Sequence, residues 1–505
     1  MPEIDLGAYR ADQGFYLVGS RTGARFEQGP AEPGGYAHRF SYRGSATTIA
    51  DAAVDLVRGA RGKIFLASYR IGDGPLLEAL YEAVDRLRGG VYVITSWDEK
   101  ALRKDLPDLA PEETAHEVKA QLKRFDEMTR RGITVRGHPS CHAKFLVVDD
   151  RAALVSSANL ETSALRGTAD RAVTGESGTL LTDAGEAQLL GRFFTRMWFA
   201  GCTGEARPGD KYALKDRGVE PSPCDVPVPP VGPRAGVIWT HEDEHGILET
   251  INDIVDRSRD ELLLASYSLV GLAEQPRRLL DAIARACARG VRVSLLVRGR
   301  NLPRDLRDAR MLTELGVRLF PDSLTHAKGA LADGRTGALF SANFDFDHGL
   351  INGVEMGVRL DGTPALADAH RYLRHAMRNA DMEYAARPSQ RELAAGYPAR
   401  WRKAWPLPAA VPITTDPSTW ARFAAAAAHP PVLFEAQGDE VALVTARDRW
   451  LLERAGNRWR LAGQQSADDP LSLLGRWSRA GGRRTGTEER PTTRGFADAT
   501  FSLGD

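Results

Sequence analysis

The apolar residues of the chain follow one pattern twice. Apolar positions at i, i+4, i+7 and i+8 begin at Ile49 and again at Ile247, a spacing typical of an amphipathic helix. Nineteen residues after each isoleucine lies a serine, Ser68 or Ser266, inside a short apolar run, IFLASYRI or LLLASYSL. Such runs are typical of buried strands. Both contain the letters ASY, so the two regions agree in sequence as well as in hydropathy.

The repeat continues through several predicted elements. Each half has a helix (PLLEALYEAVDRL or PRRLLDAIARACA), a strand (VYVIT or VRVSLLV) and a second helix that ends at Gly132 or Gly316. Glycine suits the left-handed position just after a helix. Each of these glycines precedes a histidine, His142 or His326, by ten residues. The preserved spacing indicates two homologous halves. The alternation of strands and helices predicts an α/β fold in which mixed sheets are flanked by helices.

Changes in composition divide the chain into five predicted segments. The stretch between the halves is rich in Pro and Gly and has no apolar periodicity, so we interpret it as a linker. We expect an N-terminal extension (1–40), a first lobe (41–203), the linker (204–235), a second lobe (236–389), and a small β-rich C-terminal module with a partly disordered tail (390–505).

Composition narrows the class of protein. Of the 505 residues, 43% are hydrophobic and 27% are charged, as in soluble globular proteins. No signal peptide and no membrane span is indicated, so we expect a cytoplasmic protein. Lys+Arg and Asp+Glu both number 67, which leaves no overall charge to attract nucleic acid or anionic membrane, although a local basic groove is compatible with this balance. The four cysteines form no CxxC pair and are expected to be reduced thiols: Cys141, Cys202, Cys224 and Cys287.

Each half carries the motif H-x-K-x4-D followed by S-x-N. The residues are His142, Lys144, Asp149, Ser157 and Asn159 in the first half, and His326, Lys328, Asp333, Ser341 and Asn343 in the second. On a strand, positions i and i+2 face the same side, so each histidine and its lysine are expected to point into one site. The S-x-N segments are predicted to form the adjacent strand, which would bring each asparagine beside the pair.

Two imidazoles, two ammoniums and two carboxamides suit the chemistry of a phosphodiester. A neutral histidine can attack phosphorus, while a protonated one donates to the leaving oxygen. Lysines and asparagines would stabilise the non-bridging oxygens. Glu176 and Glu355 are candidates to hold each imidazole in one tautomer, although surface salt bridges are the alternative. We expect Asp149 and Asp333 to brace the lysines or the interface between halves, and Ser157 and Ser341 either to support the site or simply to pack.

A metal centre is not predicted, because a lysine two residues from each histidine would oppose a cation. We therefore expect neither a metal nor another cofactor.

These motifs resemble the phospholipase D superfamily, whose signature is HxKxxxxD followed by a short Gly/Ser-x-Asn segment. The resemblance covers about residues 45 to 385. It implies two lobes related by a pseudo-twofold axis, an active site at their seam, and a two-step reaction through a phospho-histidine. By the usual assignment in the family, His142 would be the nucleophile and His326 the general acid/base. Gly329 departs from the pattern, because a large apolar residue is expected after the second lysine.

Three functions remain open. A lone HxK is more often a packed histidine than a catalyst, but two copies in matching register favour catalysis. A nuclease acting on DNA or RNA, in DNA processing or phage defence, is preferred, since the strings SSAN and FSAN lack the Gly-rich form typical of the lipid synthases. The alternatives are a phospholipase or cardiolipin-synthase-like phosphatidyltransferase that acts on phospholipid, and a non-catalytic scaffold. A protein activator and the oligomeric state are left open.

Overall fold

The structure is a computed structural model of the 505-residue chain. It describes residues 10–11, 14–20, 24–29, 34–72, 74–96, 120, 123–167, 172–209, 215–216, 222, 224–272, 278–346, 349–398, 413–427, 433–437, 440–444, 448–455, 458–466 and 501–502. Most of the expected C-terminal tail lies outside these ranges. The chain divides into two compact units, and each is described by itself.

The larger unit consists of Thr22–Arg298 and Leu315–Ala380 and contains two mixed sheets. Nine of the described strands form the first sheet in the spatial order β11 (Lys215–Asp216), β10 (Gly204–Glu205), β6 (Thr134–His138), β5 (Val91–Ser96), β4 (Ile64–Ser68), β7 (Phe145–Val148), β8 (Ala152–Ser156), β9 (Glu176–Leu181) and β3 (Tyr36–Ser41). Strands β4, β5 and β6 are parallel, whereas β7, β8, β9 and β3 continue the sheet antiparallel.

The second sheet repeats this order. Eight described strands form it as β13 (Glu244–His245), β12 (Gly236–His241), β21 (Glu355–Arg359), β19 (Thr336–Phe340), β18 (Gly329–Ala332), β14 (Glu261–Ser266), β16 (Arg292–Arg298) and β17 (Arg318–Asp322). Its parallel strands β14, β16 and β17 correspond to β4, β5 and β6, and its antiparallel strands β18, β19, β21 and β12 correspond to β7, β8, β9 and β3. The predicted mixed sheets and internal repeat are therefore confirmed.

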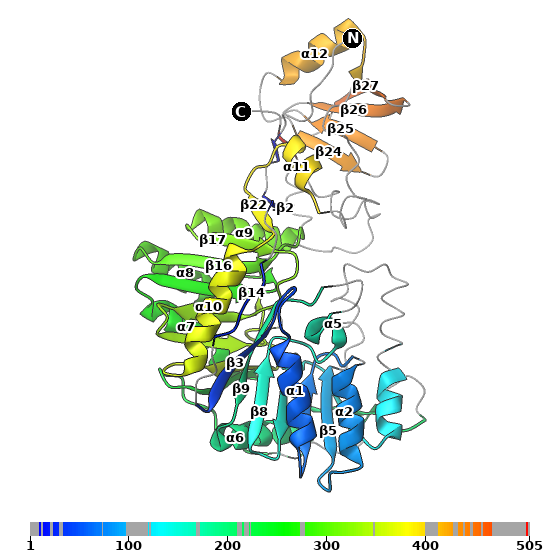
Figure 1. Cartoon of the computed structure of the whole chain (residues 1–505). Helices are drawn as coiled ribbons and strands as arrows, with labels where there is room; N and C mark the ends of the chain where they lie inside the picture. Colours follow the sequence, from blue (N-terminus) through cyan, green and yellow to red (C-terminus); the bar gives the residue numbers. More distant parts are fainter. Residues whose placement is uncertain are drawn as a thin grey trace. The chain divides into compact units, whose positions relative to one another are not determined.

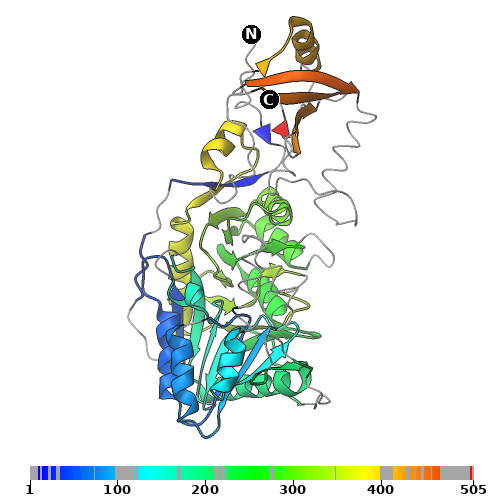
Figure 2. The same ribbon diagram turned by 90° about the vertical axis from the view of Figure 1, so that its right-hand side faces the viewer.

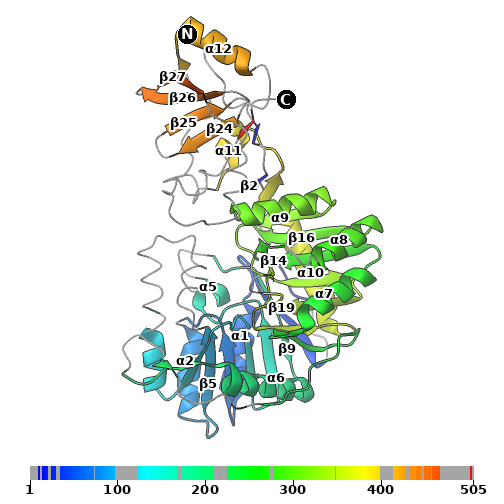
Figure 3. The same cartoon turned by 180° about the vertical axis from the view of Figure 1, so that it is seen from behind.

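Helices cover the faces of both sheets, as the amphipathic spacing predicts. The described helices of this unit include α1 (Thr48–Gly59), α2 (Pro75–Val84), α5 (Thr162–Leu165), α6 (Ala184–Arg196), which continues as a π-helical turn over Met197–Gly201, α7 (Gly246–Arg257), α8 (Arg278–Ala288) and α10 (Pro364–Arg378). Residues 123–130, before Gly132, are also helical. Helices α1 and α2 lie side by side over the first sheet (Figures 1 and 2), and α7 and α8 lie side by side over the second (Figure 3).

The helices α6 and α10 join the two halves. Helix α6 packs on the first sheet and also contacts β12 of the second, whereas α10 packs on the second sheet and also contacts β3 of the first. Side chains of both helices and both sheets therefore share one buried core, in which Phe193, Trp239 and Tyr372 are fully buried. Because this core is common to both halves, it fixes their relative position. A site built from residues of both halves requires such a fixed position.

Two glycines confirm the predicted helix ends. Gly132 and Gly316 have φ of 92° and 94°, in the left-handed region that side chains with a Cβ atom rarely adopt. Each one turns the chain from a helix into the strand that leads toward a motif histidine. The equal spacing seen in the sequence thus reflects the same turn made twice.

The smaller unit consists of Met1–Arg21, Gly299–Glu314 and Asp381–Asp505. Its described elements include β2 (Phe15–Val18), α9 (Pro303–Glu314), β22 (Met382–Ala385), α11 (Gln390–Gly396) and α12 (Pro417–Ala427). An antiparallel meander follows from β24 (Leu433–Gln437), β25 (Glu440–Val444), β26 (Asp448–Ala455) and β27 (Arg458–Ser466), flanked by the short strands β1 (Arg10–Ala11), β23 (Ile413–Thr414) and β28 (Phe501–Ser502). The strands β24 to β27 lie within 390–505, where a β-rich module was predicted, but the unit also contains Met1–Arg21 and Gly299–Glu314.

Candidate active site

The two motif histidines lie where the halves exchange backbone hydrogen bonds. The N–H of His142 donates to the carbonyl of Val354 at 3.0 Å, and the N–H of Val354 donates to the carbonyl of Ser140 at 2.9 Å. The same exchange occurs on the other side, where the N–H of His326 donates to the carbonyl of Gly175 at 2.7 Å. Each histidine therefore stands in an extended segment just before its motif strand, β7 or β18, and pairs there with the opposite half.

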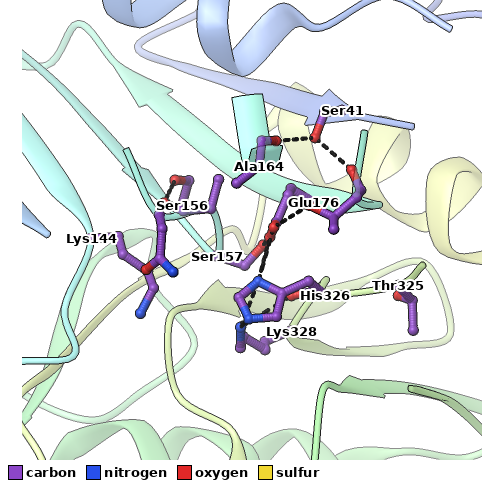
Figure 4. A network of polar contacts seen from close by, with 12 residues as sticks. Ser41, Lys144, Ser156, Ser157, Ala164, Glu176, Thr325, His326 and Lys328 are labelled. Atoms are coloured by element: carbon purple, nitrogen blue, oxygen red, sulfur yellow. Dashed lines mark hydrogen bonds and ion pairs between the residues drawn. The ribbon is translucent and has the colours of Figure 1, made fainter. Parts of the chain in front are cut away.

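Each imidazole is oriented by a glutamate of the other half. The Nδ1 atom of His142 lies 2.6 Å from Oε1 of Glu355, and Nδ1 of His326 lies 2.9 Å from both carboxylate oxygens of Glu176. Figure 4 shows Glu176 pointing toward His326 across the seam. Both carboxylates are 1% exposed, so the surface salt bridge considered above is wrong for both. A carboxylate at Nδ1 favours the tautomer with its proton there and leaves Nε2 as the reactive nitrogen.

The glutamates are in turn held by the serines of the S-x-N segments. The hydroxyl of Ser157 donates to Oε2 of Glu176 at 2.6 Å and accepts from the backbone N–H of Ser177 at 3.0 Å. Ser341 donates to Glu355 in the same way and accepts from the N–H of Met356 at 2.9 Å. These serines therefore do more than pack, because they fix the carboxylates that fix the imidazoles.

Two glycines bring the strands close enough for these bonds. A Cβ atom on Gly178 would lie 2.7 Å from the carbonyl oxygen of Val155, and one on Gly357 would lie 2.7 Å from Cβ of Phe340. Each glycine stands two residues after a site glutamate, in GESG or VEMG. The repeated glycine was a sequence signal for this close approach.

The electrostatics of the pairs favour ionised glutamates. Burial alone would raise the pKa of Glu176, but His326, Lys328 and Ser157 lower it to about 2. The pKa of Glu355 is likewise lowered by His142 and Lys144, against the effect of burial. Burial lowers the pKa of His326 to about 4, although Glu176 opposes this effect, and burial also lowers the pKa of His142. In the free protein near neutral pH, the imidazoles are therefore neutral and the carboxylates charged.

Both motif lysines are fully buried beside the imidazoles. The ammonium of Lys144 donates to the carbonyl oxygen of His142 at 2.5 Å, and that of Lys328 lies 2.9 Å from Nε2 of His326 (Figure 4). One positive charge thus lies close to the reactive nitrogen of His326, and a second lies at the backbone of His142. Such charges would attract the non-bridging oxygens of a phosphate.

The asparagines are positioned by the serines of the shared ASY segments. Ser68 accepts a hydrogen bond from the N–H of Leu160 at 3.0 Å, and Ser266 accepts one from the N–H of Phe344 at 2.9 Å. These bonds fix the residues that directly follow Asn159 and Asn343. The carboxamide oxygens of both asparagines are buried and have no hydrogen-bond partner within the described part of the chain.

The tyrosines of the ASY segments complete each half-site. The ring of Tyr69 lies 5.1 Å from the ring of His142, and that of Tyr267 lies 4.8 Å from the ring of His326. These two tyrosines were not among the predicted site residues. The signal was present, since the letters recur in both halves at the end of the strand next to the motif strand.

The motif aspartates do not brace the lysines or the seam, which corrects the prediction for Asp149 and Asp333. The carboxylate of Asp149 accepts from the backbone N–H groups of three consecutive residues, 61–63, at 2.7–2.9 Å. Asp333 accepts from those of residues 259–261 at 2.8–2.9 Å. Both aspartates follow the motif strand at the end opposite to the histidine. They therefore fix the loop before β4 or β14.

The structure thus brings eight of the twelve predicted residues together at the seam, namely the histidines, lysines, serines and glutamates. The asparagines stand two residues after the seam serines with no described contact to these groups, and the two aspartates lie elsewhere. Among the described residues, no three His, Cys, Asp or Glu side chains gather to hold a metal ion. No described helix is long and apolar enough to cross a membrane.

Comparisons with solved structures give distant similarities. Phosphatidylserine synthase from Haemophilus influenzae Rd KW20 is 16% identical, covers 69% of this chain and 87% of its own, and has a TM-score of 0.47. Polyphosphate kinase from Porphyromonas gingivalis is 15% identical, with coverages of 68% and 50% and a TM-score of 0.43. The phospholipase D family member Nuc from Salmonella typhimurium is 21% identical, with coverages of 30% and 99% and a TM-score of 0.26. No curated protein matches the chain.

The sequence also matches a family model described as cardiolipin synthase, PLD-like domain. The match covers residues 54–198 and 251–377, which together are more than half of the chain and contain both motifs. The chain belongs to the phospholipase D-like family and is an enzyme of that phosphodiesterase superfamily.

Proposed function

We propose that the protein is a metal-independent phosphodiesterase that cleaves nucleic acid through a covalent phospho-histidine. The observation that carries the reaction is the crossed pair of contacts, in which a buried glutamate of each half holds the histidine of the other at Nδ1. Two equivalent, oriented imidazoles beside two ammoniums suit a two-step displacement at phosphorus.

In the first step, the Nε2 lone pair of His142 forms a bond to phosphorus as the bond to the leaving oxygen breaks. That oxygen takes a proton from His326. In the second step, neutral His326 takes a proton from water, the water oxygen bonds to phosphorus, and the phosphorus–nitrogen bond returns its electron pair to His142. The order of the two histidines follows the assignment usual in the family.

The acid step requires His326 to be protonated, although burial lowers its pKa in the free protein. A bound phosphodiester brings a negative charge close to the imidazole, and such a charge raises the pKa of a nearby histidine. Substrate binding would therefore prepare the general acid. Lys144 and Lys328 would at the same time move onto the non-bridging oxygens, with the carboxamides of Asn159 and Asn343 beside them.

The lysines also support a reaction that needs no metal. Each buried ammonium lies within hydrogen-bonding distance of an atom of its histidine. A divalent cation bound by the same imidazoles would be repelled by both charges. The lysines would supply the positive charge that a metal supplies in other phosphodiesterases.

The preference for nucleic acid rests on arginines beside both half-sites. The guanidinium of Arg70 lies 5.6 Å from the ring centre of Tyr69, and that of Arg298 lies 5.9 Å from the ring centre of Tyr267. These are the tyrosines that contact the two motif histidines. Positive charge on both sides of the reacting phosphate suits a nucleic-acid backbone, because cationic side chains can then also bind the phosphates that flank the reacting one.

The test uses labelled single- and double-stranded DNA and RNA, and in parallel vesicles of phosphatidylcholine and of phosphatidylglycerol, all with EDTA. His142→Ala and His326→Ala would be compared with His370→Gln, a histidine that contacts Glu261 instead of the site. We expect strand cleavage that resists EDTA, is abolished in both alanine variants and is retained in the control. Acid-quenched intermediate trapped on histidine would identify the covalent step.

Other outcomes would change the proposal. Headgroup release or exchange with nucleic acid left intact would assign the lipid reaction instead. Cleavage that EDTA abolishes would refute the metal-free mechanism. Equal activity in His142→Ala and the wild type would refute this site altogether.

A further inference from the structure

A cavity of about 950 Å³ lies in the larger unit at the end of β7 opposite to His142. Its walls are α1, α10 and β3, with the turns that follow β7 and β18. The motif strand connects it to the catalytic histidine, because His142 precedes β7 and Asp149, which lines the cavity, follows it. Seven residues of extended chain span roughly 23 Å, so the cavity is separate from the phosphodiester site.

Two of the four carboxylates in the cavity wall are paired with cationic side chains. Asp149 accepts the three backbone hydrogen bonds described above, and Asp51 pairs with Arg166 at 2.8 Å. Asp368 lies 2.9 Å from Nδ1 of His38 and pairs with Arg371 at 2.6 Å. Asp51 and Asp368 are therefore balanced by cationic side chains, whereas Asp149 stays ionised and interacts electrostatically with Arg151.

Two guanidiniums in the wall are differently placed. Arg61 and Arg151 have side chains with no hydrogen bond or ion pair to any described residue, and both line the cavity. Both residues are exposed and their backbones lie close together, because Oδ2 of Asp149 accepts from the backbone N–H of Arg61 at 2.8 Å and Arg151 stands two residues after Asp149. Among the lining acids, Asp55 and Asp149 make no ion pair with a described residue. The turn after β7 thus places two guanidinium groups, of Arg61 and Arg151, near the one carboxylate of Asp149.

The remainder of the wall is largely apolar. Apolar side chains contributed by α1, by the β7–β8 region and by β9 and α10 face the same space as the arginines: Leu56, Val148, Ala152, Leu180 and Pro364. The volume is near the upper end of the range for small-molecule sites, and these apolar side chains suit the organic part of a ligand. Paired guanidiniums are the groups best suited to phosphate.

We propose that this cavity is a second ligand site that takes a small organic phosphate, with the phosphate at Arg61 and Arg151 and the organic part against the apolar wall. It does not depend on the nucleic-acid assignment above. Only its effect on catalysis rests on the proposed function.

A continuous path of hydrogen bonds leads from the cavity to the general acid. His38 lines the cavity, and its Nε2 lies 3.0 Å from the hydroxyl of Ser177. The backbone N–H of Ser177 donates to Ser157, which donates to Glu176, the partner of His326. A ligand that draws Arg371 away from Asp368 would disturb the first member of this path.

The path exists in one half only. Met356 follows Glu355 as Ser177 follows Glu176, and its backbone N–H makes the equivalent bond to Ser341. A methionine side chain offers no hydroxyl to continue the path. The ligand is therefore expected to act on Glu176 and His326, and to leave Glu355 and His142 unaffected.

Calorimetry on the full chain tests binding without any need for turnover. The probes are inorganic phosphate, ADP and glycerol 3-phosphate, which distinguish a bare anion, a nucleotide and a small phosphate such as a lipid headgroup. The catalytic site also binds phosphate, so the wild type is compared with Arg61→Gln/Arg151→Gln. The matched control is Arg58→Gln, which changes an exposed arginine of α1 outside the cavity wall.

We expect an organic phosphate to show two sites on the wild type and on Arg58→Gln. One of them should weaken by about tenfold or more in the double variant, because two charge-assisted hydrogen bonds are lost. Inorganic phosphate should bind the cavity more weakly than at least one organic probe. Identical binding to the double variant and the control would overturn the proposal, as would a single site on the wild type.

Ser177→Ala tests the path, with Thr179→Val on the same strand as control. Saturating ligand should change kcat for bis(p-nitrophenyl) phosphate by at least about twofold in the wild type and in Thr179→Val, but not in Ser177→Ala, which still binds. If the protein does not hydrolyse this diester, amide hydrogen exchange of residues 174–178 with and without ligand is compared among the same three proteins. An unchanged exchange pattern on binding would refute the coupling while leaving the ligand site in place.

Discussion

Replacing Glu355 by glutamine should disable His142, although the two residues belong to different halves of the repeat. The carboxylate is 1% exposed and lies 2.6 Å from Nδ1 of the imidazole. Glutamine has nearly the same volume, so packing around the site is preserved. The change removes the negative charge and lets the amide favour the tautomer with its proton on Nε2, which cannot attack phosphorus.

The size of the effect follows from the role of the pair. Removing the carboxylate that orients a catalytic histidine lowers kcat by about 10⁴-fold in serine proteases, and general acid–base catalysis contributes about 10²- to 10⁴-fold. We therefore expect kcat to fall by about 10³- to 10⁴-fold, which corresponds to about 4–5.5 kcal/mol in activation free energy. KM should change by less than about threefold, since Glu355 does not contact the substrate in the proposed mechanism.

Steady-state hydrolysis of bis(p-nitrophenyl) phosphate measures this directly. The matched control is Glu261→Gln, which breaks a pair of the same type, 3.0 Å from His370, at the opposite end of the second sheet's strands. The control should keep kcat within about twofold. Glu176→Gln should reproduce the loss through His326.

The pH profile separates the two pairs. The charge of Glu355 raises the pKa of His142 against the effect of burial, so removing it lowers that pKa further. If His142 must be neutral to attack, the acidic limb of kcat/KM moves to lower pH while the basic limb, assigned to His326, stays. A kcat loss below tenfold, or movement of the basic limb alone, would refute the crossed assignment.

Three further changes test the frame around the site. Asp149→Ala removes the acceptor of three backbone hydrogen bonds at a residue with φ of 55°, so urea denaturation should show a loss of about 2–4 kcal/mol with kcat of the folded enzyme retained. Ser266→Ala leaves the buried N–H of Phe344 without its acceptor, which should cost about 1–3 kcal/mol and lower kcat by about tenfold as Asn343 shifts. Burial lowers the pKa of His138 to about 3, so stability should fall as pH drops from about 6.5 toward 3; His138→Gln should flatten this fall in urea midpoints by up to about 1.4 kcal/mol per pH unit.

The local spacing of apolar residues and glycines was sufficient to predict most of the helices and strands. The helix that contains Ile49 and the strand that ends at Ser68 were predicted from apolar spacing, and their counterparts around Ser266 from the repeat. Burial of one face of a helix or both faces of a strand dictates such spacing, so the sequence records it directly. The left-handed glycines at 132 and 316 were predictable for the same reason, because their conformation excludes other residues.

The role of the motif aspartates could not be predicted in this way. Asp149 follows Lys144 by five residues and was predicted to brace the lysines or the interface between halves. The strand between them carries the carboxylate to the other end of the sheet, where it meets the loop before β4. Distance along a strand grows by about 3.3 Å per residue, so neighbours in the motif are distant in space.

The sequence by itself determined that there are two equivalent half-sites and which side chains each one supplies, since spacing and residue type are properties of the chain. It could not decide which glutamate serves which histidine. Glu176 follows His142 by 34 residues, and sequence order suggests that they belong together. Only the tertiary structure crosses the pairs, because β9 and β21 begin at the seam and the backbone beside each glutamate bonds to the opposite histidine segment. Each histidine thereby depends on the other half for its orientation, so the site exists only when both halves are folded against their shared core.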